Sequence, residues 1–482
     1  MPADRILPVT QQAPDEGACC GACAEESAAV TRTPEAAQPS PTSSTTVAPI
    51  IALTSRPSRP PISRSEDRLI TFGGVATAAG LLGIAVASIA LPEAARRGLW
   101  LPLHLGLAGA AGTAIAAVLP FFTAALAVAP PARAAIRVAA VACVAVGALV
   151  ISGGVALNAT SLAVAGGLVY IAGLAAIALA AFTPLRGSLG PRRRLVETAY
   201  AAALVQVVVG AATATALLAG FVPVVERWAL LKPAHAWLNV FGFLSVVVAA
   251  TLLHLAPTVA GTRIRARASA VVAVVGLSAG APIVALGLAL ASDPVARLGA
   301  VIEILGAASL VVHAFAVWRA RGAWTTNPAW HRVTGWSLTI APLWLLVAVA
   351  IAAGRVVDAG ASPASWSLDL LAAPLAVGWV AQVIVGSWSH VLPAIGPGDM
   401  PAHARQREIL GFGALPRFVA LNGGVGLVTL GGLVEAAALI TAGAVLIVAA
   451  LAVGLGLFAL AARGRVVVKP VGAAGLTGSA QG

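Results

Sequence analysis

Long uninterrupted apolar runs restrict what this sequence can fold into more than any other feature. After Arg68, runs of about 20 apolar residues recur to the end of the chain, and this length crosses the hydrocarbon core of a bilayer as a helix. The runs are continuous rather than alternating, and Ala, Leu and Gly dominate them, so they predict helices and not barrel strands. We place twelve transmembrane helices, at about residues 69–91, 99–127, 134–152, 159–183, 197–222, 234–258, 268–291, 297–318, 333–353, 367–393, 416–437 and 440–462.

The low charge of the chain supports this interpretation. Only 10% of the 482 residues are charged and the mean hydropathy is +0.94, whereas soluble domains carry roughly 25% charged residues. Such a chain cannot cover a water-facing globule, which excludes a cytosolic enzyme, a nucleic-acid-binding domain and a secreted disulfide scaffold. We expect an all-α polytopic membrane protein that has the lipid bilayer, and no nucleic acid, as its partner.

The basic residues alternate from loop to loop as a twelve-helix topology requires. If the N-terminus is cytoplasmic, the inside segments carry 24 Lys and Arg residues and the outside loops carry six. Cytoplasmic loops carry this excess of basic residues under the positive-inside rule. We therefore predict a multi-pass protein of the plasma membrane with both termini in the cytoplasm.

The two ends of the sequence differ from the apolar region between them. Residues 1–67 are rich in Pro, Ser, Thr and Ala, and this composition predicts a disordered cytoplasmic tail. We expect residues 68–465 to form the membrane domain and residues 466–482 to form a flexible C-terminal tail. The first tail contains Cys19, Cys20 and Cys23, whose thiolates could capture Cu(I) or Zn. The alternative is that these thiols are incidental.

A weak internal repeat links three of the even-numbered helices. They end in similar sequences, Ala117–Pro120, His254–Pro257 and His390–Pro393, and the three prolines are 137 and 136 residues apart. This period predicts three four-helix units in which helices 2, 6 and 10 are equivalent.

Two histidines near the starts of helices 2 and 6 are the sharpest site candidates. His104 and His235 each follow a proline by two residues, and the topology places both in the outer leaflet. Neutral imidazole is a ligand for haem iron and copper. Asn239, one turn after His235, and Asp369, at a matching depth on helix 10, could support the histidines or act as weak ligands. The alternative is that each histidine only forms hydrogen bonds in the interfacial zone.

Other ionisable residues in the helices are weaker candidates. Three of them fall on the cytoplasmic side, namely His254, His313 and His390. We expect these histidines either to form a proton path or simply to cap helix ends. Glu303 on helix 8 and Glu435 on helix 11 are expected to be buried carboxylates, and for Glu303 a proton relay and a structural hydrogen bond are both open.

These helices and motifs resemble the catalytic subunit of haem–copper oxidases and, more closely, actinobacterial membrane proteins related to the NnrS family. The residues that carry the resemblance are Leu103–Ala110, His235–Gly242 with Thr251–Thr258, and Gly378–Val383. The resemblance implies a haem–copper-oxidase-like fold, with His104 at the position of a haem ligand and His235 at that of a copper ligand. It also implies a redox or multicopper oxidase partner.

The sequence departs from the oxidase pattern at two places. Helix 7, at residues 268–291, contains no histidine, and helix 10 has Leu368–Leu371 where the oxidases carry two histidines. Full oxidase or reductase chemistry is therefore not expected. The first hypothesis is a single haem or copper at His104 and His235, with a role in copper or nitrogen-oxide handling or in electron transfer. The alternative is a transporter that uses the buried histidines and Glu303 in a substrate or proton path.

Overall fold

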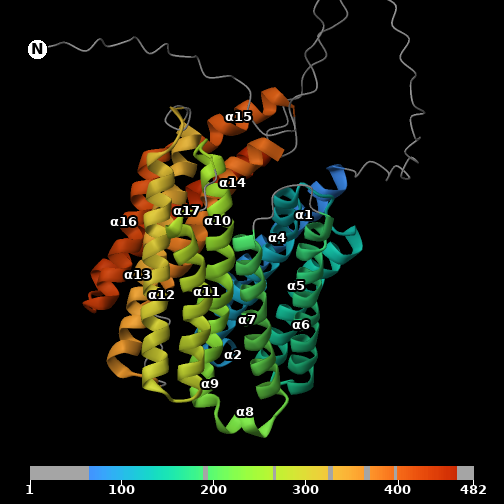
Figure 1. Ribbon diagram of the computed structural model, residues 1–482, viewed down its shortest axis with the longest axis vertical. Helices are drawn as coiled ribbons and strands as arrows, with labels where there is room; N and C mark the ends of the chain where they lie inside the picture. The colour runs from blue at the N-terminus through green and yellow to red at the C-terminus, as the bar shows by residue number, and fades with distance from the viewer. Residues whose placement is uncertain are drawn as a thin grey trace, which may run out of the picture. The chain divides into compact units, whose positions relative to one another are not determined.

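The computed structural model describes residues 64–187, 194–263, 267–323, 329–362, 370–395 and 399–463, and the regular elements in these ranges are helices (Figure 1). Twelve helical stretches are long and apolar enough to cross a membrane, which confirms an all-helical protein with twelve candidate spans. They are Glu66–Ser88, Glu93–Ala127, Ala134–Ala156, Thr160–Arg186, Arg194–Leu218, Trp228–Val259, Ala268–Ala289, Asp293–Arg319, Ala329–Ala359, Ala372–Ala394, Ala414–Leu433 and Ala437–Arg463.

Several spans consist of more than one helical element. In chain order the elements are α1 (Arg64–Ser88), α2 (Glu93–Arg96), α3 (Trp100–His104), η1 (Leu105–Ala111), α4 (Gly112–Ala127), α5 (Ala134–Ala156), α6 (Thr160–Phe182), η2 (Pro184–Gly187), α7 (Arg194–Leu218), α8 (Val222–Glu226), α9 (Trp228–Trp237), η3 (Leu238–Ser245), α10 (Val246–Val259), α11 (Ala268–Ala289), α12 (Asp293–Arg319), α13 (Ala329–Ala359), η6 (Ala372–Ala381), α14 (Gln382–Ile395), α15 (Met400–Gly411), α16 (Ala414–Leu433) and α17 (Ala437–Arg463).

The N-terminal boundary differs slightly from the sequence expectation. Residues 64–67, which the expected tail included, form the first turn of α1. The rest of that tail, with Cys19, Cys20 and Cys23, and the C-terminal residues 466–482 lie outside the described residues. The tail assignments and the cysteine site therefore stay predictions.

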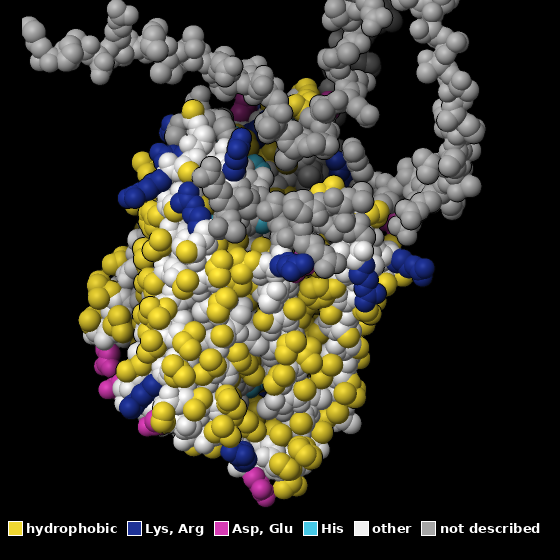
Figure 2. Space-filling view, viewed as in Figure 1, with side chains coloured by type: hydrophobic (Ala, Val, Ile, Leu, Met, Phe, Trp, Pro, Cys, Tyr) yellow, Lys and Arg dark blue, Asp and Glu magenta, His cyan; other side chains and the backbone are white. Residues whose placement is uncertain are grey.

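The basic side chains gather towards one end of the helices. We call this end, which carries α15, the start of α1 and the end of α14, the α15 end, and the opposite end, which carries α2 and α8, the α8 end (Figure 1). Most of the Lys and Arg side chains visible in Figure 2 lie towards the α15 end. The six basic residues expected outside lie at the α8 end: Arg96, Arg97, Arg227, Lys232, Arg297 and Arg355.

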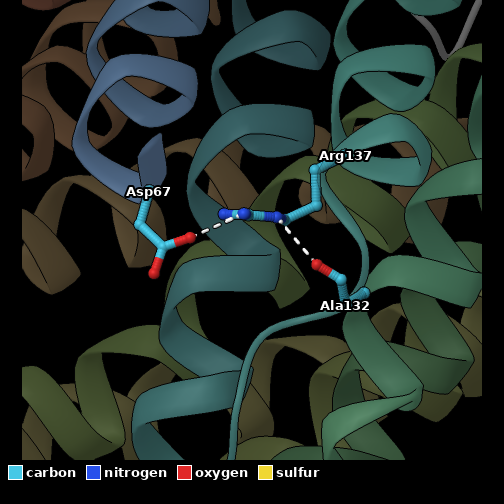
Figure 3. A network of polar contacts seen from close by, with 3 residues as sticks. All are labelled: Asp67, Ala132 and Arg137. Carbon is cyan, nitrogen blue, oxygen red and sulfur yellow. Dashed lines mark hydrogen bonds and ion pairs between the residues drawn. The ribbon is translucent and has the colours of Figure 1, made fainter. Parts of the chain in front are cut away.

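A partly buried ion pair holds the start of α1 against α5 (Figure 3). The Arg137 Nη2 atom lies 2.6 Å from Asp67 Oδ1, and Arg137 Nε donates to the carbonyl oxygen of Ala132 at 3.0 Å. Because Arg137 is only 5% exposed, its charge depends on these two partners.

The sixth span is the most enclosed. In its most apolar stretch, 78% of the residues are buried inside the protein. In the corresponding stretch of the twelfth span, 17% are buried. Two of its aromatic residues, Trp237 and Phe241, are fully buried. This span therefore lies at the centre of the described helices, and polar groups on it are shielded from lipid and water.

Glycines bring neighbouring helices into backbone contact in three hairpins, α5 with α6, α11 with α12, and α16 with α17. In the first hairpin, a Cβ atom on Gly147 would lie 2.6 Å from the backbone nitrogen of Tyr170. In the second, a Cβ atom on Gly280 would lie 2.7 Å from the backbone nitrogen of Glu303. In the third, a Cβ atom on Gly424 would lie 2.7 Å from the carbonyl oxygen of Gly443. Small residues allow this close packing in lipid.

Three π-helical segments interrupt the second, sixth and tenth spans. They are η1, η3 and η6, and they begin at Leu105, Leu238 and Ala372, which are 133 and 134 residues apart. π-helix is rare and is frequent at functional sites. The spacing is close to the proline period seen in the sequence.

Candidate functional site

His104 ends the short helix α3 and is fixed by the turn before it. Its Nδ1 atom lies 2.8 Å from the carbonyl oxygen of Trp100, and its ring stacks on the Trp100 indole with 4.0 Å between ring centroids. A carbonyl oxygen can only accept, so Nδ1 carries the proton of the neutral ring. Nε2 therefore keeps its lone pair and would be the ligating atom of a bound metal.

His235 on α9 is held in the same tautomer by a neighbouring span. Its Nδ1 atom lies 2.9 Å from the carbonyl oxygen of Gly210 on α7 and 3.2 Å from Asn239 Nδ2. The carbonyl oxygen is nearer and can only accept, so we assign the proton to Nδ1 here as well. The Trp228 indole is tilted against the ring at a centroid distance of 6.1 Å. Like His104, His235 presents an Nε2 lone pair.

The two histidines lie in the same part of the described helices. They come from different spans, but the rings are close enough for a charge on one to act on the other. Ligating histidines usually donate their second ring nitrogen to a carbonyl or carboxylate, which fixes the ring and its tautomer. We call His104 and His235 the histidine pair. It lies towards the α8 end, as the topology from sequence predicted.

Asn239 contacts His235, and its role as a supporting residue or a weak ligand stays a prediction. Its Nδ2 atom donates to the His235 carbonyl oxygen at 2.6 Å, and it packs so tightly on Gly210 that a Cβ there would lie 2.4 Å from Nδ2. Asp369, the other expected supporting residue, lies outside the described residues.

The π-helical segments next to the pair were not foreseen. η1 begins directly after His104, and η3 begins three residues after His235. Tyr170 on α6 donates to the Ala108 carbonyl oxygen within η1 at 3.3 Å. No sequence signal separates a π segment from an ordinary glycine-containing helix, and the only hint is the glycine at Gly109 or Gly242.

Glu303 forms a separate buried polar contact. Its Oε2 atom accepts from the Trp237 indole nitrogen at 2.7 Å, and both residues are fully buried. Its Oε1 atom has no hydrogen-bond partner among the described residues. Because Trp237 and His235 are two residues apart on one helix, they face different directions, and Glu303 is not part of the histidine pair.

The histidines at the α15 end have different neighbours. His313 Nδ1 lies 3.4 Å from Ser269 Oγ, whereas His390 stacks on Trp330 at a centroid distance of 5.7 Å. His254 has a buried Nδ1 atom on α10. Whether these three form one proton path stays a prediction.

The expectation for Glu435 was wrong. Glu435 is exposed, and it lies with a φ of 55° in the turn between α16 and α17. The apolar residues on both sides of it suggested a span, but the chain reverses there, and the carboxylate reaches water.

The donor set limits what the histidine pair could hold. Among the described residues there is no group of three or more His, Cys, Asp and Glu side chains that could share a metal ion. Two imidazoles do not complete the four-coordinate site that structural zinc requires. Imidazole is a ligand type that haem iron and copper accept, and for haem the macrocycle would supply the remaining nitrogens.

The comparisons with known proteins do not assign the chain. No protein-family model matches it, and no curated protein matches it significantly. The functional interpretation therefore depends on the residues themselves.

Proposed function

We propose that this integral membrane protein binds one haem or one copper ion through His104 and His235, with a role in copper or nitrogen-oxide handling or in electron transfer. The observation that carries the proposal is the shared arrangement of the two rings. Each donates Nδ1–H to a backbone carbonyl, and the rings lie within electrostatic range of each other. The Nε2 lone pair of each ring is therefore left for a ligand.

The surroundings favour ligation by neutral imidazole. Both side chains lie inside apolar spans and are only partly exposed, so a positive charge on either ring loses much of its hydration. The stack on Trp100 restricts the His104 ring further. A bound metal would supply redox chemistry or ligand binding, and the protein groups named here hold and orient it.

The repeated features support a haem–copper-oxidase-like grouping into three four-helix units. Each proposed unit has a π segment in its second span and a glycine-packed hairpin formed by its third and fourth spans. The histidine pair joins the first unit to the second. The resemblance to NnrS-related proteins points the same way, and a redox or multicopper oxidase partner would then dock at the α8 end.

The test is an optical spectrum with metal analysis of the purified protein. We expect a Soret band, or copper near one equivalent, in the wild-type protein from haem- and copper-replete cells. His104→Ala and His235→Ala should each remove it, because two protein ligands leave no substitute. His403→Ala on α15, which removes a histidine far from the pair, is the matched control.

Three outcomes would contradict the assignment. These are a colourless and metal-free wild-type protein, equal occupancy in all three variants, or loss of the cofactor in the His403→Ala control. Monodisperse elution of each variant in detergent separates loss of the ligand from loss of the fold.

The buried carboxyl of Glu303 favours the alternative of a transporter. It is fully buried and one of its oxygens has no partner among the described residues, and ionisable groups within a membrane mark ion or proton paths. In reconstituted vesicles with an imposed potential, this alternative expects proton flux that Glu303→Gln abolishes. The transporter alternative would be contradicted if the wild-type protein showed no proton flux, or if the flux were unchanged in the Glu303→Gln variant.

A further inference from the structure

A group of nitrogen-bearing side chains surrounds one indole at the α15 end. Trp330 at the start of α13 is tilted against its neighbour His331 at a centroid distance of 3.5 Å and stacks on His390 of α14 at 5.7 Å. The guanidinium of Arg407, on α15, lies 5.3 Å from the same indole. We call these four residues the Trp330 cluster. It joins three elements and is far from the histidine pair.

The Trp330 cluster carries positive charge without a matching acid. Arg407 lies close enough to both imidazoles to act on them electrostatically, and the two imidazoles also act on each other. Within the described ranges neither Arg407 nor His390 forms an ion pair with a carboxylate. The Arg407 guanidinium therefore brings a positive charge to the cluster, and a counter-charge that entered the site would stabilise it.

Two of its nitrogen atoms lack partners. The Nε atom of Arg407 and the Nδ1 atom of His390 are buried, and neither has a hydrogen-bond partner in the described part of the chain. Trp330 and His331 are 7% and 8% exposed. A buried donor without a partner costs about 1–3 kcal/mol, and more when the group is charged. The cluster is therefore incomplete as it stands.

The backbone around the cluster is closely packed. A Cβ atom on Gly411, at the end of α15, would lie 2.8 Å from the Trp330 backbone nitrogen. The end of α15 is thus packed closely against the start of α13, which brings Arg407 beside Trp330. Cation–π stacking on Trp330 explains how Arg407 is positioned, but it does not supply an acceptor for its N–H groups.

We propose that the Trp330 cluster binds a phosphate-type oxyanion, held by Arg407 and His390 with His331 beside them. An oxyanion supplies the missing negative charge and accepts from a guanidinium in a geometry that suits its planar fork. A phosphate group could come from a phospholipid head group of the adjoining leaflet or from a free phosphate compound. The chemistry of the site is the same for both.

The experiment measures the thermal stability of the full-length protein in a phosphate-free detergent. Sodium phosphate is titrated against sodium chloride at matched ionic strength. In parallel, the protein is reconstituted in phosphatidylcholine vesicles with and without phosphatidic acid. We expect a saturable rise of the melting temperature with phosphate, or a rise that occurs only with phosphatidic acid. The first result identifies a free oxyanion and the second a lipid head group, and either supports the site.

The variants separate the site from general surface charge. Arg407→Gln should weaken the apparent affinity about 10-fold or more, since a charged hydrogen bond is worth about 1.5–3 kcal/mol and each 1.4 kcal/mol is tenfold. Arg405→Gln removes the same charge from an exposed position two residues away on α15 and should leave the affinity unchanged. If Arg407→Gln fails to fold, His390→Gln should show a weakening in the same direction.

The proposal is overturned by any of three results. Chloride could raise the melting temperature as much as phosphate does. The Arg405→Gln variant could lose as much affinity as Arg407→Gln. Or neither phosphate nor phosphatidic acid could have any saturable effect on the wild-type protein.

Discussion

Gly210 determines how closely α7 approaches His235. Its carbonyl oxygen fixes the His235 tautomer, and its missing side chain leaves room for Asn239. We expect Gly210→Ala to push Asn239 aside, to cost about 1–3 kcal/mol of unfolding free energy from overpacking and to lower cofactor occupancy.

A glycine without such neighbours is the control for this change. At Gly354 on α13, no atom outside the backbone of its own helix lies within 4 Å of the position that a Cβ would take. Gly354→Ala should therefore be neutral or stabilising by about 0.5–1 kcal/mol. Denaturant unfolding in detergent measures both variants. Equal destabilisation by the two would show that the contact with Asn239 is not the cause.

The Trp237–Glu303 hydrogen bond makes a second prediction for single residues. Trp237→Phe removes the donor and leaves a fully buried carboxyl without its partner, which should cost about 1–3 kcal/mol. Glu303→Gln keeps an oxygen that can accept from Trp237, and it removes the ionisable group, so it should cost less. Thermal unfolding of the two variants tests this order, and the reverse order would contradict it.

At the level of elements, the Arg137–Asp67 pair anchors α1 to α5 (Figure 3). Arg137→Ala should lower the unfolding free energy by about 1–3 kcal/mol, because it removes hydrogen bonds of a charged group and leaves a partly exposed carboxylate unpaired. The exposed Asp293–Arg297 pair, at 3.9 Å, is the matched comparison. Arg297→Ala there should cost about 0–1 kcal/mol. Similar losses in the two variants would refute the anchoring role.

At the scale of the whole molecule, the distribution of basic residues predicts the orientation in the membrane. Nine spans separate Glu93 from Met400, so these residues lie on opposite sides. On a background without the four native cysteines, Glu93→Cys should react with an impermeant maleimide in intact cells, and Met400→Cys only after permeabilisation. The opposite pattern would reverse the orientation, and labelling of both from outside would contradict the span count.

The sequence predicted the spans well because crossing a bilayer needs about 20 apolar residues, whatever the helices pack against. It also placed His104 and His235 at one depth. It could not reveal that Gly210 and Trp100 fix their tautomers, because those contacts depend on how neighbouring turns and spans pack. Glu435 was misplaced for a related reason, since a turn between two apolar helices resembles a continuous span.

The glycine-packed hairpins bear on how the chain is made. Each joins two helices that are adjacent in sequence, such as α11 and α12, through contacts between their own backbones. Contacts that are local in sequence form early, because little loop entropy is lost in closing them. Such hairpins can therefore assemble during synthesis, before the later helices have left the ribosome. Insertion into the membrane would then proceed in pairs of helices, with the histidine pair completed only when the sixth span arrives.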